Sequence, residues 1–227
     1  MQQLNTPMPI GQPLQCDSVE FSSHWNNSFL LACKRLIDVG AAAMLLVLLF
    51  PCFVVLIILV KISSPGPVFY LWKVVGKGGR PFTGYKFRSM VCNADEMKPG
   101  LDALNEMNGP VFKLTDDPRV TRIGRWLRRY SLDELPQLYS VLKGDMSLVG
   151  PRPPLVTEYE KFTSHQKQKL AVKPGMTCLW QVNGRNKVSD FDDWVSLDLE
   201  YIRNWSLGLD LKILAQTVAE VLAGSGK

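Results

Sequence analysis

Residues 39–60 form an apolar run without a single charged side chain, and this run limits the possible folds more than any other feature of the chain. Its 22 residues would rise about 33 Å as an α-helix, enough to cross a hydrocarbon core of about 30 Å. A helix that is apolar on all sides over this length is typical of a membrane segment. The sequence therefore predicts that residues 29–62 form a helix that meets a membrane.

The way in which this run meets the membrane depends on a proline and on its flanking charges. Pro51 lies near the middle of the run, where it removes a helix hydrogen bond and kinks the axis. Lys34 and Arg35 precede the run and Lys61 follows it, and the positive-inside tendency draws both ends to the cytoplasmic side. A re-entrant helix bent at Pro51 and a kinked helix that spans the membrane are about equally compatible with these features.

The rest of the composition is that of a globular domain with a basic bias. The net charge is +5, which suits an anionic membrane surface, a phosphorylated substrate or nucleic acid. The five cysteines form no C-x-x-C pair and no zinc spacing, so free thiols are expected. We expect residues 1–28, which are rich in Gln, Asn, Ser and Pro, to be a mobile tail, residues 63–223 to be one domain, and residues 224–227 to be a C-terminal tail.

Beyond the apolar run the chain mixes strand and helix patterns, which predicts an α+β fold. Residues 68–75 and 81–90 are typical of two strands joined by a glycine-rich turn. In the second strand Lys86 and Arg88 alternate with aromatic residues, so both cations are expected on one face. Two neighbouring cations suit a diphosphate, although a solvated strand face has the same pattern.

Residues 119–130 have the pattern of a basic amphipathic helix. Four arginines and Trp126 surround its apolar stripe. Helices of this kind commonly lie on anionic lipid, and a core-facing helix with a solvated basic side is the alternative. This helix would bring the following residues close to the lipid headgroups.

Residues 131–138 (SLDELPQL) hold two adjacent carboxylates, Asp133 and Glu134. On a helix these side chains point roughly 100° apart, so one could attack a substrate while the other holds a metal ion. Ser131 and Glu134 also match the S-x-x-E capping box of a helix start, which is a purely structural reading.

Several polar residues further along the chain are candidates for binding or for structural roles. Arg152 lies between prolines, which stiffen the backbone around its guanidinium, and Arg185 lies in a predicted turn. Asp198 falls on the apolar face of a predicted helix over residues 191–205, where we expect a structural ion pair with an arginine. Residues 155–172 have the composition of a polar surface helix.

In this order, these segments resemble the bacterial sugar transferases, the monotopic polyprenyl-phosphate phosphoglycosyltransferases. The resemblance extends from about residue 34 to the C-terminus and looks most like the short members that begin exopolysaccharide or O-antigen repeat units. Ile37 departs from the aromatic residue that the family commonly has before Asp38. The motifs that carry the resemblance are KR with Asp38, YKFRSM at 85–90, SLDELPQL at 131–138, SLVGPRP at 147–153, KPGMT at 173–177, and WQV with GRN at 180–186.

The resemblance implies a reaction in which a nucleoside diphosphate sugar, usually a UDP-sugar, gives its sugar-1-phosphate to undecaprenyl phosphate and releases UMP. By resemblance, Asp133 is the nucleophile that forms a phosphosugar-aspartate intermediate, and Glu134 binds Mg²⁺. The family also implies a re-entrant helix bent at Pro51, in the bacterial inner membrane, with the active site on the cytoplasmic face. The expected phosphate contacts are Lys86, Arg88, Arg152 and Arg185.

Two other classes of function compete with this interpretation. In a membrane-anchored scaffold the carboxylate pair would serve only as a helix cap. A nucleic-acid-binding protein is disfavoured because the aromatic residues lie on apolar helix faces and do not interleave with the basic residues. The sequence does not identify the sugar, and it leaves the oligomeric state open, including a homo-oligomer.

Overall fold

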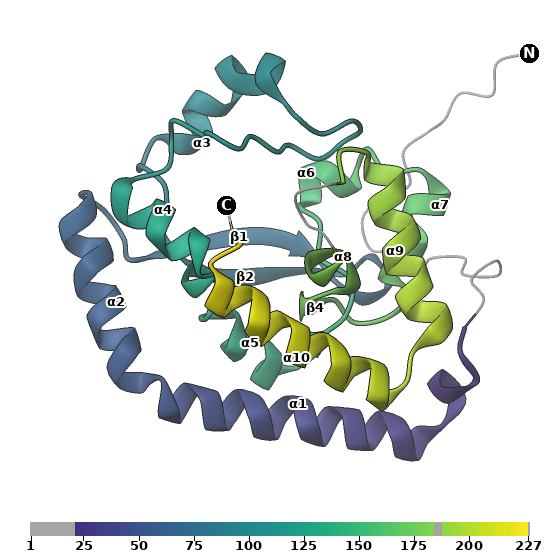
Figure 1. The fold of residues 1–227 in the computed structure, drawn as a ribbon. Coiled ribbons are helices and arrows are strands. Elements are labelled where there is room, and N and C mark those ends of the chain that lie inside the picture. The colour runs from purple at the N-terminus through teal and green to yellow at the C-terminus, as the bar shows by residue number, and fades with distance from the viewer. Residues whose placement is uncertain (1–20, 184–187, 227) are drawn as a thin grey trace, which may run out of the picture.

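The computed structural model describes residues 21–183 and 188–226 and confirms the predicted α+β class. Two long helices, α1 (Ser28–Leu48) and α2 (Phe50–Ser63), run along one side of the molecule (Figure 1). The antiparallel strands β1 (Phe69–Val75) and β2 (Pro81–Phe87) form the predicted hairpin, with η2 (Lys77–Gly79) as its turn.

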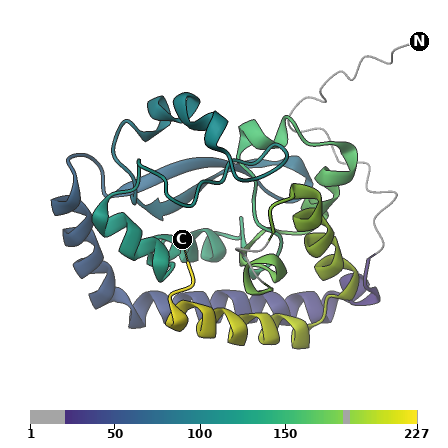
Figure 2. The ribbon, with the colours of Figure 1, turned by 45° about the horizontal axis from the view of Figure 1, so that its top comes forward.

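Short elements surround this hairpin and end in two longer helices. Two of them, β3 (Ser147–Val149) and β4 (Gly175–Thr177), form a parallel pair. Figure 2 shows that α10 runs beside α1. The other elements are η1 (Ser23–Asn26), α3 (Ala94–Met97), η3 (Lys98–Leu104), α4 (Arg122–Arg129), η4 (Leu132–Glu134), α5 (Gln137–Lys143), α6 (Val156–Tyr159), α7 (Ser164–Lys167), η5 (Gln168–Ala171), α8 (Leu179–Val182), α9 (Phe191–Asn204) and α10 (Leu207–Ala223).

The apolar run forms the two helices α1 and α2, in keeping with the predicted bend within residues 29–62. Within the described residues, no single helix is both long and apolar enough to cross a membrane, whereas α1 and α2 taken together are, with a bend of 65° between them. The chain breaks at Leu49, and Pro51 lies in the first turn of α2. Because the N–H groups of a first turn lack helix partners, proline is tolerated there. The predicted bend is thus present, two residues before Pro51.

A polar stripe on α1 fastens this helix to the rest of the protein. Lys34 Nζ lies 2.6 Å from Asp210 Oδ2 of α10, and Asp38 accepts hydrogen bonds from Ser147 Oγ and the Leu148 amide. Arg35 donates to two carbonyl oxygens at the C-terminal end of α5. The two cations before the apolar run, which the sequence analysis took as topology signals, therefore make structural contacts within the protein.

The end of the predicted N-terminal tail is packed against α9. Trp25 stacks on Trp205 with ring centres 4.2 Å apart and donates its indole N–H to the carbonyl of Ile202. Ser22 Oγ donates to the carbonyl of Trp205. The prediction of a mobile tail is therefore wrong for residues 22–27, because they pack on the buried Trp205. Residues 1–20 lie outside the described part of the chain.

Two apolar clusters hold the elements together. The larger one contains the apolar face of α9, including Phe191, Trp194 and Ile202, which confirms the helical periodicity read from the sequence. In the smaller one, side chains of α2 pack on Phe87 of the hairpin and Leu127 of α4. This second cluster places the end of the apolar run directly beneath the segment that leads to Asp133.

Candidate active site

The carboxylate pair lies in a short turn that follows an unusual backbone conformation. Ser131 has φ +52°, and within the described residues it is the one non-glycine residue with a positive φ. A left-handed residue of this kind costs about 1–2 kcal/mol and is held by its surroundings. Asp133 and Glu134 then occupy the 3-10 turn η4, and the following α-helix begins at Gln137.

The predicted capping box at Ser131 is wrong. The Ser131 side chain makes no capping hydrogen bond, and its φ value differs from that of an N-cap residue. Because the left-handed turn reverses the chain after α4, the pair faces the hairpin and does not begin a long helix. The structure therefore does not support the interpretation that Asp133 and Glu134 serve only to cap a helix.

Two cations from distant elements converge on Glu134. Lys86 Nζ of β2 lies 3.1 Å from Glu134 Oε1, and Arg152 NH1 lies 3.8 Å from the same oxygen. All three side chains are largely shielded from solvent. An ionised carboxylate with two cations at this distance forms a small charge network of the kind that binds phosphate groups.

Lys86 is held in an enclosed position. Its ammonium group lies 4.2 Å from the centre of the Trp72 ring, a cation–π contact across the hairpin. Trp72 faces Gly84 in the register, and a Cβ at Gly84 would lie 2.2 Å from the indole nitrogen, so only glycine fits there. The pKa of Lys86 lies below its ordinary value because the side chain is buried. The carboxylates of Glu134 and Asp133 oppose this shift in part.

Arg128 is a third cation at the site, and the sequence analysis missed its role. It was grouped with the arginines expected at the lipid surface, but its guanidinium turns inward and its Nε donates to Ser89 Oγ at 2.9 Å. The pKa of Arg128 lies below its ordinary value because the side chain is buried, and the carboxylate of Asp133 opposes this shift in part. Asp133 therefore shares its cavities with the cations Lys86 and Arg128 and interacts electrostatically with both.

A tight backbone frame positions Arg152, as the flanking prolines predicted. Gly150 donates its N–H to the Thr177 carbonyl, and Gly175 donates to the Pro151 carbonyl, which locks the two segments together. A Cβ on Gly175 would lie 2.1 Å from the Gly150 nitrogen, so this close approach requires glycine. The parallel pair β3–β4 thus fixes the point from which Arg152 reaches Glu134.

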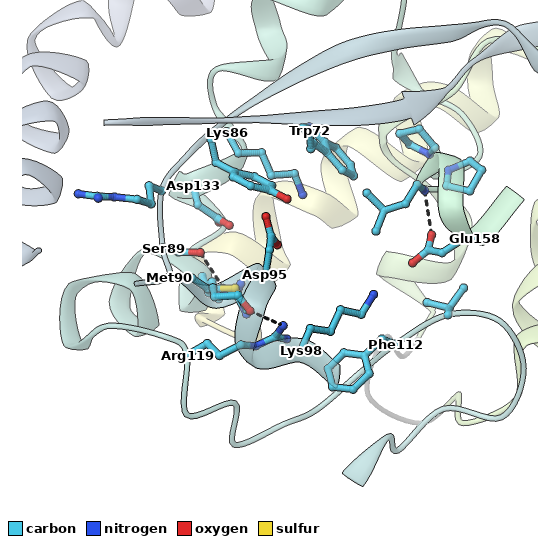
Figure 3. Close-up of a pocket in the computed structure, with 18 of the residues that line it drawn as sticks. Trp72, Lys86, Ser89, Met90, Asp95, Lys98, Phe112, Arg119, Asp133 and Glu158 are labelled. Carbon is cyan, nitrogen blue, oxygen red and sulfur yellow. Dashed lines mark hydrogen bonds between the residues drawn. The ribbon is translucent and has the colours of Figure 1, made fainter. Parts of the chain in front are cut away.

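Two adjoining cavities meet at the carboxylate pair. The larger cavity, of about 350 Å³, is lined by Asp133 and has aromatic walls (Figure 3). The smaller cavity, of about 240 Å³, is lined by Asp133 and Glu134 together. Lys86, Arg128 and Arg152 line both. The Asp133 carboxylate can therefore contact a ligand held in either cavity.

Comparison with known proteins identifies the relationships of the chain. The sequence profile of the bacterial sugar transferase family matches residues 29–224. The chain belongs to the bacterial sugar transferase family. The resemblance read from the motifs is therefore confirmed, and it covers both α1–α2 and the elements around the cavities.

Three relatives of this chain have informative names. The galactosyl transferase CpsE of Streptococcus agalactiae serotype III is 50% identical over 198 residues, which cover 86% of this chain and 43% of that protein. The exopolysaccharide production protein ExoY of Rhizobium meliloti is 42% identical over 198 residues, covering 85% of this chain and 87% of that protein. The UDP-glucose:undecaprenyl-phosphate glucose-1-phosphate transferase of Xanthomonas campestris pv. campestris is 42% identical over 204 residues, covering 87% of this chain and 40% of that protein. The chain thus spans less than half the length of the first and third of these relatives.

Two of the predicted phosphate contacts stay predictions. Arg88 lines the larger cavity together with Lys86, but its guanidinium donates to the carbonyl oxygens of Ser64 and Pro65 and so ties β2 to the turn after α2. Arg185 lies outside the described residues.

Asp198 forms the predicted structural ion pair, but with a different partner. Lys169 Nζ lies 2.6 Å from Asp198 Oδ2, and both side chains are almost completely buried. The pKa of Asp198 lies above its ordinary value because the side chain is buried, and the ammonium group of Lys169 opposes this shift in part. The expected arginine is replaced by a lysine from residues 155–172, a segment that forms short, partly buried helices and not the predicted polar surface helix.

The predicted Mg²⁺ ion would have to share the site with its substrate. Within residues 21–183 and 188–226, His, Cys, Asp and Glu form no cluster of three that could hold a metal ion. Mg²⁺ is commonly bound by one or two carboxylates together with substrate phosphates and water. The Glu134 carboxylate fits as one ligand of an ion of this kind, whereas a cage made only of protein ligands is not present in the described chain.

Proposed function

We propose that this chain is a phosphoglycosyltransferase that moves a sugar-1-phosphate from a UDP-sugar to undecaprenyl phosphate and releases UMP. The observation that carries the proposal is the position of Asp133, at the junction of two cavities and beside Lys86, Arg128 and Arg152. The names of the relatives, which include a UDP-glucose:undecaprenyl-phosphate glucose-1-phosphate transferase, support the same reaction class. Such a step would begin the assembly of an exopolysaccharide, capsule or O-antigen repeat unit.

In the first half-reaction a carboxylate oxygen of Asp133 attacks the phosphorus that carries the sugar. The bond from this phosphorus to the bridging oxygen breaks, and UMP leaves with the electron pair. The product is a phosphosugar-aspartate. Lys86, Arg128 and Arg152 neutralise charge on the diphosphate and the departing UMP, which is the main requirement of phosphoryl transfer.

In the second half-reaction a phosphate oxygen of undecaprenyl phosphate attacks the same phosphorus. The bond to Asp133 breaks, the aspartate carboxylate is regenerated, and the lipid-linked diphosphate sugar leaves. A covalent intermediate allows one soluble and one lipid substrate to use the site in turn. The two cavities that meet at Asp133 suit this alternation.

Glu134 would hold a Mg²⁺ ion together with the substrate phosphates, which leaves Asp133 free to attack. Bound there, the ion would neutralise charge on the diphosphate and help to orient it. In the structure Lys86 and Arg152 neutralise Glu134, so the carboxylate already lies where phosphate-binding cations converge. This arrangement supports a shared site for the ion and the diphosphate.

The membrane placement that we propose is a re-entrant helix pair at the inner membrane, with the cavities on the cytoplasmic face. The 65° bend between α1 and α2 supports it, as does a dense set of exposed apolar side chains along both helices. Exposed apolar surface of this extent marks a membrane or protein contact. The exposed side chains include Met44, Val47, Leu48, Phe50, Val54, Val55, Ile58 and Ile62.

The topology can be tested with the chain's own cysteines. Variants that keep a single cysteine, either Cys16 before α1 or the exposed Cys92 after α2, would be labelled with a membrane-impermeant maleimide in intact spheroplasts and in inverted vesicles. A re-entrant pair requires both positions to react from the cytoplasmic side. Labelling of Cys16 and Cys92 from opposite sides would establish a spanning segment and overturn this part of the proposal.

The reaction itself is tested by UMP release. Purified protein in nanodiscs that contain undecaprenyl phosphate would be incubated with Mg²⁺ and a panel of UDP-sugars. We expect UMP and a lipid-linked diphosphate sugar with one donor or a few, and loss of both when EDTA is added. Absence of UMP with every donor would contradict the proposed function and favour a membrane-anchored scaffold.

A further inference from the structure

Besides Asp133 and the exposed Asp95, a third carboxyl group lines the larger cavity, on the wall opposite Asp133. This group belongs to Glu158 of the short helix α6, and Figure 3 shows the side chains of Asp133 and Glu158 facing each other across the cavity. Glu158 Oε2 accepts a hydrogen bond from the Leu155 amide at 2.9 Å. In Figure 3 the other carboxyl oxygen points toward the cavity interior. The proposed transfer chemistry leaves this group without a role.

The surroundings of Glu158 favour a polar contact with a neutral ligand group. The pKa of Glu158 lies above its ordinary value because the side chain is buried. The cations Arg152, Lys98 and Lys169 oppose this shift in part. A carboxyl group in such a place can accept a hydrogen bond and, when protonated, can also donate one. Hydroxyl groups match this capacity because they too both donate and accept.

The remaining walls of the cavity combine aromatic rings with cations. Trp72, Phe112, Phe191 and Trp194 line it, and Trp72 and Trp194 also carry the cation–π contacts to Lys86 and Arg152. A pyranose ring has apolar C–H faces that pack on aromatic rings and a rim of hydroxyl groups that need hydrogen-bond partners. Aromatic rings beside the carboxyl group of Glu158 are therefore suited to a hexose. The smaller cavity, which Glu158 does not line, has a more polar wall that includes Lys113, Thr115 and Asp117.

The position of the reacting phosphorus orients the sugar. Asp133 must lie against the phosphorus during the transfer, and the sugar is attached to that phosphorus through its anomeric oxygen. A hexose that extends from Asp133 into the larger cavity presents its remote hydroxyl groups to the opposite wall. Glu158 is on that wall.

We propose that Glu158 forms a hydrogen bond with one remote hydroxyl group of the transferred sugar and thereby selects the donor. This inference rests on the proposed function. A site built to bond a hydroxyl discriminates strongly against a substrate that lacks it, because its polar group is then left unpaired. Glu158 is thus a specificity residue, separate from the pair that carries out the transfer.

A structural role makes a different prediction. The bond from the Leu155 amide to Glu158 caps the first turn of α6, so removal of the carboxyl group also weakens a helix start. A weakened cap would affect every donor to the same degree. Contact with the sugar would instead affect donors differently, according to whether they carry the contacted hydroxyl.

The test combines a change in the enzyme with a change in the donor, in the manner of a double-mutant cycle. kcat/KM would be measured for the wild type and Glu158→Ala with the preferred UDP-hexose and with analogues that lack one remote hydroxyl each. We expect Glu158→Ala to lower kcat/KM about tenfold or more for the parent donor and to have little further effect on one deoxy analogue. Glu158→Gln retains an oxygen to accept from Leu155 and is the second variant if alanine prevents folding.

Two controls separate the possible results. Glu160→Ala removes an exposed carboxylate two residues away and should leave all ratios unchanged. Inhibition by UMP should be the same in the wild type and Glu158→Ala, because the proposed contact is with the sugar. Equal losses for all donors, or a parallel change in UMP inhibition, would overturn the role in sugar selection while leaving the transfer reaction intact. A wild type that releases no UMP with any donor would overturn the proposed function and this inference with it.

Discussion

Replacing Asp133 with asparagine should abolish UMP release with every UDP-sugar. Asparagine has nearly the same shape as aspartate, so the turn η4 and its neighbours should be retained. The amide lacks the nucleophilic oxygen, and its loss removes the covalent route. We expect kcat/KM to fall by about 10³-fold or more, as for other nucleophiles whose loss disables a catalytic unit.

Intact mass provides an independent measurement of the same effect. Wild-type protein incubated with Mg²⁺ and its donor, without lipid, should gain the mass of one sugar phosphate, and Asp133→Asn should gain none. Asp116→Asn is the matched control, because it makes the same chemical change at an exposed carboxylate. An adduct of unchanged yield in Asp133→Asn would show that another residue is the nucleophile.

The second large effect is expected from the buried pair of Lys169 and Asp198. Lys169 lines the larger cavity, and its Nζ lies 2.6 Å from Asp198 Oδ2 and 4.9 Å from the centre of the Trp194 ring. Lys169→Met removes the cation and leaves a buried carboxyl group without its partner. Breaking a buried pair in this way costs about 3–5 kcal/mol, which lowers the melting temperature of a chain of this size by about 10 °C.

Thermal unfolding in detergent or nanodiscs measures this loss directly. Lys161→Met is the matched control, because it removes an exposed lysine from the same segment and should change the melting temperature little. In the double variant Lys169→Met with Asp198→Leu most of the loss should be recovered, because no unpaired charge remains in the core. A melting temperature of Lys169→Met equal to that of the wild type would show that the pair contributes nothing to stability.

Several features could be predicted from the sequence because they depend on local order along the chain. The length of the apolar run, the strand alternation before Lys86, and the helical periodicity of residues 191–205 all repeat at fixed short intervals. Pro51 predicted a bend in the apolar run because proline removes a hydrogen bond, although the break itself falls at Leu49. Asp133 and Glu134 stood out because arginines precede them and because they lie in a motif, SLDELPQL, that carries the family resemblance.

Other features were decided only by tertiary structure, because they join residues far apart in the chain. Lys86 and Glu134 are 48 positions apart and meet only when the hairpin packs on η4. Arg88 and Lys169 could not be assigned from their own neighbourhoods, because each partner is chosen by packing. The left-handed turn at Ser131 likewise depends on surrounding contacts that hold a strained residue.

The sequence alone therefore determined the kinds of elements and the identity of the carboxylate pair, since both are encoded in short patterns and motifs. The tertiary structure decided which cations surround that pair, where the two cavities lie, and which buried charges are paired. The reason is physical: local patterns are set by backbone geometry, whereas the choice among several similar cations depends on which of them the packed core brings within a few ångströms of a carboxylate.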